Sequence, residues 1–103
     1  MTEIRYLREA LGDIREALEY LGDRSPLAAE RFSRDLVELL EKVSQHPNFG
    51  YPFGPFYRKA AMRSLPWSVV YRTDEEEGVL WIVIVRHDRR HPSYGMKRER
   101  PDA

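Results

Sequence analysis

The segment from Leu65 to His87 constrains the fold of this chain more than any other stretch of its sequence. It contains two apolar runs, rich in β-branched and aromatic residues, on either side of the acidic turn Asp74–Gly78. Such runs, separated by a short turn that ends in glycine, predict an antiparallel β-hairpin. The first run alternates between two faces, with Trp67, Val69 and Tyr71 on one and Ser68, Val70 and Arg72 on the other.

The second run, Val79–Val85, is apolar on both faces. A strand of this composition is covered on both sides, so we expect it centrally in a sheet with other elements packed on each face. Directly after it, the segment Arg86–Tyr94 is dense in cationic and titratable side chains. A buried strand that delivers such a cluster to the surface is a good scaffold for a binding or catalytic site.

Two amphipathic helices are predicted ahead of the hairpin, over about residues 8–22 and 26–45. The first carries an apolar stripe at spacings of three and four residues, formed by Leu11, Ile14, Leu18 and Leu21. Gly22 is expected to end this helix, and Ser25-Pro26 to begin the next with Ser25 as its N-cap. A connection of three or four residues makes the two helices an antiparallel hairpin.

Three further segments complete the predicted fold. Residues 3–7 alternate between polar and apolar side chains and are expected to form a short strand, and residues 57–64 a second one. Residues 47–57 contain three prolines, two glycines and five aromatic residues, which exclude regular structure there. Two interpretations of these rings remain open: they cap the core, or they form a surface that binds a partner.

These elements combine into an α+β domain of order β-α-α-β-β-β, in which an N-terminal helical hairpin packs on a three- or four-stranded antiparallel sheet. We expect residues 1–94 to form a single domain and residues 95–103 a polar, flexible C-terminal tail. The predicted core includes Leu11, Ile14, Leu18, Phe32, Leu36, Leu40, Val69, Tyr71, Ile82 and Ile84.

The bulk composition narrows the class of protein. A chain of 103 residues is one domain, and the absence of cysteine excludes disulfides and thiolate metal sites. No apolar run approaches the ~20 residues that span a bilayer, and no signal-peptide pattern is present, so the expected location is the cytoplasm. The net charge is zero, but residues 86–100 carry six Lys or Arg against two acids. This basic end indicates either an anionic partner or a solvated tail.

A metal or cofactor site is not expected. His87 and His91 are four residues apart, which is a ligand spacing only on a helix, and Pro92 argues against helix there. The serines lack the context of a nucleophile, and glycine-rich phosphate loops are absent. Ribonuclease chemistry without a metal remains open, because His87, His91 and Tyr94 are able to transfer protons beside many cations.

The order of these motifs resembles the RelE/ParE toxin superfamily, also described as plasmid stabilisation proteins. The resemblance covers about residues 3–94. It rests on the Ser-Pro helix start, on Leu-Pro-Trp-Ser-Val-Val-Tyr-Arg followed by the acidic turn and the apolar strand, and on His-Asp-Arg-Arg-His-Pro-Ser-Tyr. It implies a helix pair on an antiparallel sheet and a role as the toxin of a bacterial type II toxin–antitoxin module. The implied partner is a cognate antitoxin, with which the toxin forms a hetero-oligomer.

The superfamily implies two activities. ParE-like members inhibit DNA gyrase, and a protein of this kind would not be an enzyme. RelE-like members are endoribonucleases that cleave mRNA on the ribosome without a metal. RelE-type enzymes usually carry cations where this chain has Ser68 and Ala61, although Lys59 and Tyr94 match their pattern. The sequence therefore favours the ParE-like side, with the RelE-like ribonuclease as the alternative.

The candidate site residues follow from these two activities. If the protein is a ribonuclease, the catalytic residues are His87, His91, Tyr94 and Arg63. For binding of nucleic acid or of the protein target, the candidates are Arg58, Lys59, Arg86, Arg89 and Arg90. We also expect the antitoxin to present an acidic segment with apolar anchors to a groove between the helices and the sheet.

Overall fold

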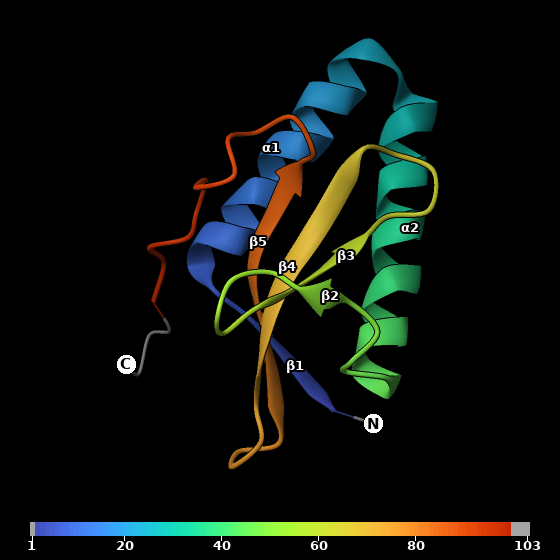
Figure 1. The fold of residues 1–103 in the computed structure, drawn as a ribbon. Coiled ribbons are helices and arrows are strands. Elements are labelled where there is room, and N and C mark those ends of the chain that lie inside the picture. Colours follow the sequence, from blue (N-terminus) through green and yellow to red (C-terminus); the bar gives the residue numbers. More distant parts are fainter. Residues whose placement is uncertain (1, 100–103) are drawn as a thin grey trace.

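A pair of antiparallel helices covers one face of a five-stranded sheet in this computed structural model, which describes residues 2–99 (Figure 1). The strand order across the sheet is β1-β5-β4-β3-β2. The elements are β1 (Glu3–Tyr6), α1 (Arg8–Arg24), α2 (Pro26–Gln45), β2 (Tyr51–Pro52), β3 (Arg58–Ala61), β4 (Trp67–Asp74) and β5 (Val79–His87).

The predicted fold class is confirmed, and the sheet has one strand more than the predicted upper number. The extra strand, β2, has two residues and lies in the proline-rich segment, where no periodic pattern of apolar residues predicts a strand. β1 pairs with β5 in parallel, while the other pairings are antiparallel. As expected, β5 is an interior strand, although the middle position of the five belongs to β4.

The junction between the helices is tighter than predicted. Ser25 alone separates α1 from α2, and Gly22 lies inside α1 instead of ending it. The backbone N–H of Ser25 still donates to the carbonyl of Leu21 at 2.7 Å, while its hydroxyl accepts from the N–H of Ala28 at 3.3 Å. The predicted role of Ser25 as the N-cap of α2 is therefore confirmed, and one residue serves both helix ends.

The face that α1 turns toward the sheet is rotated from the predicted stripe. Its buried residues are Ala10, Asp13, Ala17 and Leu21. Ile14 and Leu18 are only partly buried, and the prediction that Leu11 belongs to the core is wrong, since it is 51% exposed. The alanines let the helix approach the sheet closely. The same face carries the carboxylate of Asp13 into the interior.

The pairing between β4 and β5 contains a bulge. Val70 pairs with Ile84 and Tyr71 with Ile82, which leaves Val83 as the extra residue on β5. A bulge bends the strand and interrupts its regular pairing with its neighbour. The bulge lies just where β5 extends beyond β1, whose last pairing is between Tyr6 and Ile82.

The proline-rich loop crosses the sheet face opposite the helices (Figure 1). Phe53 and Tyr57 pack against the core, while Phe49, Tyr51 and Phe56 are exposed. The loop is fixed by the buried hydroxyl of Tyr71, which donates to the carbonyl of Pro47 at 2.7 Å and accepts from the N–H of Gly50 at 2.9 Å. Two of the five rings thus cap the core, and three remain on the surface.

Neither helix in the described part of the chain has the apolar length that a membrane span requires.

Candidate functional site

A groove of about 580 Å³ opens between α1 and the end of β5. Helix α1 lines it with Asp13, Glu16, Ala17 and Tyr20, the sheet with Trp67, Val85, Arg86 and His87, and the following segment with Arg89, Arg90 and Tyr94. The floor is apolar, because Ala17, Val85 and Trp67 are buried core residues. The rim is rich in charged and titratable side chains.

The groove exists because β5 is longer than β1. Within residues 2–99, the outer edge of β5 has no strand partner beyond Ile82. Side chains bind the backbone there instead. Asp13 Oδ2 accepts from the N–H of Val85 at 2.9 Å, and Arg98 Nη1 donates to the carbonyl of Val83 at 3.0 Å. A buried carboxylate and a guanidinium thus satisfy strand-edge groups that would otherwise be left unpaired.

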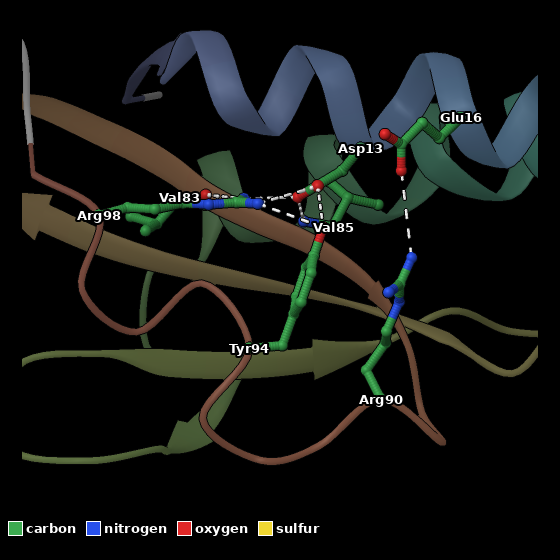
Figure 2. A network of polar contacts seen from close by, with 7 residues as sticks. All are labelled: Asp13, Glu16, Val83, Val85, Arg90, Tyr94 and Arg98. Atoms are coloured by element: carbon green, nitrogen blue, oxygen red, sulfur yellow. Dashed lines mark hydrogen bonds and ion pairs between the residues drawn. The ribbon is translucent and has the colours of Figure 1, made fainter.

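The same carboxylate joins α1 to the C-terminal segment (Figure 2). Arg98 donates to both oxygens of Asp13, at 2.6 and 3.0 Å, and the hydroxyl of Tyr94 donates to Oδ1 at 2.8 Å. The ion pair is sheltered, since the side chain of Asp13 is 4% exposed and that of Arg98 14%. A bidentate, charge-assisted contact of this kind fixes both groups in one geometry.

Two residues of the network, Tyr94 and Arg98, have pKa values above their ordinary ones. Burial raises the pKa of the Tyr94 hydroxyl, and the hydrogen bond to the Asp13 carboxylate and its negative charge raise it further. For Arg98, burial lowers the pKa, but the hydrogen bonds and charge of Asp13 outweigh burial and leave the pKa above its ordinary value. Both residues therefore keep their protons more firmly than they would in water.

A second, weaker bridge spans the groove from α1 to the segment after β5. Arg90 lies 4.0 Å from Glu16, and both side chains are more than half exposed (Figure 2). The guanidinium of Arg90 also stacks on the ring of Tyr94, 4.6 Å from its centre. Exposed ion pairs contribute roughly 0–1 kcal/mol, so a partner with a carboxylate of its own could displace Glu16 at little cost.

His87 is oriented toward the groove by two contacts. Its ring meets the ring of Trp67 edge-on at 4.6 Å, and its Nδ1 accepts from the N–H of Arg89 at 3.0 Å. Trp67 in turn contacts Tyr20 of α1 and Phe32 of α2. The imidazole is thus held against the apolar floor of the groove.

The four candidate catalytic residues do not gather in one place. His87 and Tyr94 line the groove, but its lining among the described residues includes neither His91 nor Arg63. The Nδ1 of His91 contacts the hydroxyl of Ser93 at 2.7 Å and accepts from its N–H at 3.1 Å. Arg63 lies in the connection from β3 to β4 and pairs with Glu38 of α2 at 3.4 Å.

The five candidate binding residues divide as well. Arg89 and Arg90 stand exposed at the groove. Arg86, which we expected at a binding surface, is 3% exposed and donates to the carbonyls of Arg90 and Pro92. Arg58 donates to the carbonyl of Gly50 at 2.6 Å, and Lys59 lies over the ring of Phe53. These last two residues hold the proline-rich loop.

The two positions at which the chain departs from the ribonuclease pattern are direct neighbours. Ala61 pairs with Ser68 across β3 and β4. Ser68 is buried, and its hydroxyl donates to Asp88 at 2.6 Å. The two missing cations therefore belong to a single place on the sheet, where a hydroxyl and a methyl group stand instead.

Sequence reasoning missed two residues that organise the site, Asp13 and Arg98. Asp13 is not part of the apolar stripe predicted for its helix, and Arg98 falls in the segment expected to be a flexible tail. A signal for Asp13 was present, because Ala10, Asp13, Ala17 and Leu21 follow the same helical spacing as the stripe itself. For the metal question, no three His, Asp or Glu side chains among residues 2–99 gather as metal ligands would.

Comparison with known proteins gives a consistent set of relatives. The family described as "ParE toxin of type II toxin-antitoxin system, parDE" matches residues 4–92. The curated protein Toxin ParE2 of Mycobacterium tuberculosis is 32% identical over 82 residues, which cover 79% of this chain and 76% of that protein.

Two solved structures share the fold. A chain from the chromosomal ParDE system of P. aeruginosa aligns with a TM-score of 0.72 at 20% identity, over 84% of this chain and 96% of that one. The isolated E. coli RelE toxin aligns with a TM-score of 0.61 at 21% identity, over 93% of this chain and 94% of that one. At these identities the likeness concerns the fold.

Proposed function

Because this chain belongs to the family of ParE toxins of type II toxin–antitoxin systems, we propose that it inhibits DNA gyrase in the bacterial cytoplasm. A toxin of a ParDE system has a cognate ParD antitoxin as its partner. In this proposal the antitoxin neutralises the toxin by forming a hetero-oligomer with it. The proposed toxin domain extends past residue 94, because Arg98 forms a sheltered ion pair with Asp13, and the proposed inhibition of gyrase involves no metal or cofactor.

The dispersal of the candidate catalytic residues supports a binding toxin over a nuclease. Cleavage of RNA without a metal needs a general base, a general acid and cations around one phosphate. Here His91 bonds within its own turn and Arg63 pairs with Glu38, away from the groove that holds His87. At Ser68 and Ala61 the cations of the ribonuclease pattern are replaced by small residues that are neighbours on the sheet.

The groove offers a docking site for the antitoxin. Its floor accepts an apolar side chain beside Trp67, and its rim presents Arg89 and Arg90 to a carboxylate. An acidic segment with an apolar anchor matches both features, and its charge would speed the encounter. Glu16, on the opposite wall, would repel a carboxylate, so the acidic side chains should lie toward the segment after β5.

The ribonuclease remains the second candidate, because His87 and Tyr94 line the same groove as Arg89 and Arg90. Two proton-transfer groups beside two cations are part of the set that RNA cleavage requires. The E. coli RelE toxin has the same fold as this chain, which makes the alternative structurally possible. Without Arg63 and His91, however, the set in the groove is incomplete.

One experiment separates the two activities. The protein is expressed in bacterial cells with and without its antitoxin, and plasmid topology, DNA breaks and mRNA ends at ribosome-bound codons are followed together. We expect loss of negative supercoiling or DNA breaks while mRNA stays intact, and recovery when the antitoxin is co-expressed. Codon-positioned cleavage of mRNA with unchanged topology would move the protein to the RelE side.

A further inference from the structure

We infer that Asp13 and Arg86 are positioning residues for antitoxin binding: they hold the segment Asp88–Arg98 in the conformation that presents Arg89 and Arg90 at the groove. The inference rests on the proposed function, in which these two arginines meet the antitoxin. Neither positioning residue is itself exposed, since Asp13 is 7% and Arg86 3% accessible. Both are buried charges whose partners lie largely in this segment.

Arg86 anchors the first half of the segment. Its guanidinium donates through Nη2 to the carbonyl of Arg90 and through Nη1 to that of Pro92 at 3.3 Å, while its Nε has no hydrogen-bond partner among the described residues. A buried guanidinium is costly unless its donors are satisfied, and here main-chain carbonyls of the segment accept from both of its terminal nitrogens. The turn that contains Arg89 and Arg90 is thus closed over the end of β5.

Asp13 anchors the second half. It receives the hydroxyl of Tyr94 and the bidentate guanidinium of Arg98, and it is fixed in turn by the N–H of Val85. Between Tyr94 and Arg98, Gly95 has a φ of 76° and lies so close to β5 that a Cβ would come within 2.8 Å of Ile84. The segment is therefore bound at both ends and pressed against the strand in the middle.

The exposed arginines depend on these anchors for their positions. The backbone carbonyl of Arg90 is bound by Arg86. The guanidinium of Arg90 stacks on the ring of Tyr94, and the hydroxyl of Tyr94 is bound by Asp13. The N–H of Arg89 is fixed on the imidazole of His87. If the anchors are lost, the segment samples other conformations, and the apparent affinity falls by the fraction of molecules that remain competent.

A double-mutant cycle tests the inference with the purified cognate antitoxin. The first change is Asp13→Asn, which keeps the size of the side chain and removes the ion pair with Arg98. The second is the combined Arg89→Ala and Arg90→Ala change. We expect Asp13→Asn alone to weaken antitoxin binding roughly tenfold, and to have little further effect once the two arginines are gone. Amide exchange in residues 88–98 should accelerate while α2 remains protected.

The control is Glu19→Gln, on the exposed side of the same helix, which should leave binding and exchange unchanged. If Asp13→Asn is not folded, Tyr94→Phe removes a single hydroxyl from the same anchor and takes its place in the cycle. Effects of Asp13→Asn and of the arginine changes that simply add would overturn the positioning role and leave the proposed function intact. An unchanged affinity after removal of both arginines would instead overturn antitoxin docking at this groove.

Discussion

Asp13 and Arg98 are 85 positions apart in the sequence, yet their side chains form a two-point ion pair with distances of 2.6 and 3.0 Å. The pair also binds the backbone of β5, through the N–H of Val85 and the carbonyl of Val83. It therefore joins the first helix, the longest strand and the C-terminal segment at one buried point. Because this ion pair is buried, substituting either partner should have a large effect on the free energy of unfolding.

Asp13→Ala should lower the free energy of unfolding by about 3–5 kcal/mol, because it leaves a buried guanidinium without its partner and the Val85 N–H without an acceptor. Urea denaturation of the purified toxin measures this directly. Glu19→Ala on the exposed side of the same helix is the control and should change stability by less than about 0.5 kcal/mol. Equal effects of the two substitutions would show that the Asp13 network contributes nothing to stability.

Replacement of glycine by alanine should change the stability of the protein in opposite directions at Gly50 and Gly22. At Gly50 a Cβ would lie 2.9 Å from the carbonyl oxygen of Lys59 and 2.9 Å from the hydroxyl of Tyr71, so Gly50→Ala must displace backbone or break the Tyr71 contact. We expect a loss of about 1–3 kcal/mol. At Gly22, inside α1, nothing lies within 4 Å of the added atom, and Gly22→Ala should stabilise the helix by roughly 0.5–1 kcal/mol. Thermal unfolding of both variants measures the two effects: the midpoint should fall for Gly50→Ala and rise for Gly22→Ala.

Local signals in the sequence predicted the elements well. Ser25-Pro26 predicts the start of α2 because a hydroxyl cap and a proline each act within one turn of the chain. The apolar composition of Val79–Val85 predicts an interior strand because each of its residues must leave water. The bulge at Val83 and the two-residue strand β2 were missed, since both depend on how distant segments meet.

The candidate site was less predictable for the same physical reason. The segment Arg86–Tyr94 does lie at the groove, but its sequence cannot tell which arginine points to water. Arg86 turns inward because the carbonyls of Arg90 and Pro92 fold back over it. Asp13 is not among the apolar residues from which a core is predicted, because a carboxylate rarely enters a core, and its partner Arg98 lies too far along the chain for any local pattern to connect them.

The pH dependence of stability should carry a contribution from Tyr94. Its pKa in the folded protein is raised above the ordinary value of 10.0, first by burial and then by Asp13, so folding favours the neutral hydroxyl. The stability from this group is therefore complete below pH 10 and is lost as the pH rises through the raised folded pKa. Tyr94→Phe should be less stable at neutral pH and should lose less stability above pH 10 than the wild type does.

Urea denaturation between about pH 9 and about pH 11 measures the two slopes. Tyr6 and Tyr71 also have pKa values raised by burial, so the difference between the variant and the wild type isolates Tyr94. Parallel slopes for the two proteins would contradict the assignment.

The charge at the groove should govern how fast the antitoxin binds. Arg90 is half exposed and only loosely paired with Glu16, so its field reaches an approaching partner. Arg90→Glu should slow association by about tenfold at low salt, and the wild-type rate should fall toward that of the variant as salt is added. Stopped-flow mixing with the antitoxin over a range of salt concentrations gives both rates.

Arg31→Glu makes the same change of charge on α2, away from the groove residues, and is the matched control. If it slows association as much as Arg90→Glu does, net charge and not the groove steers the encounter.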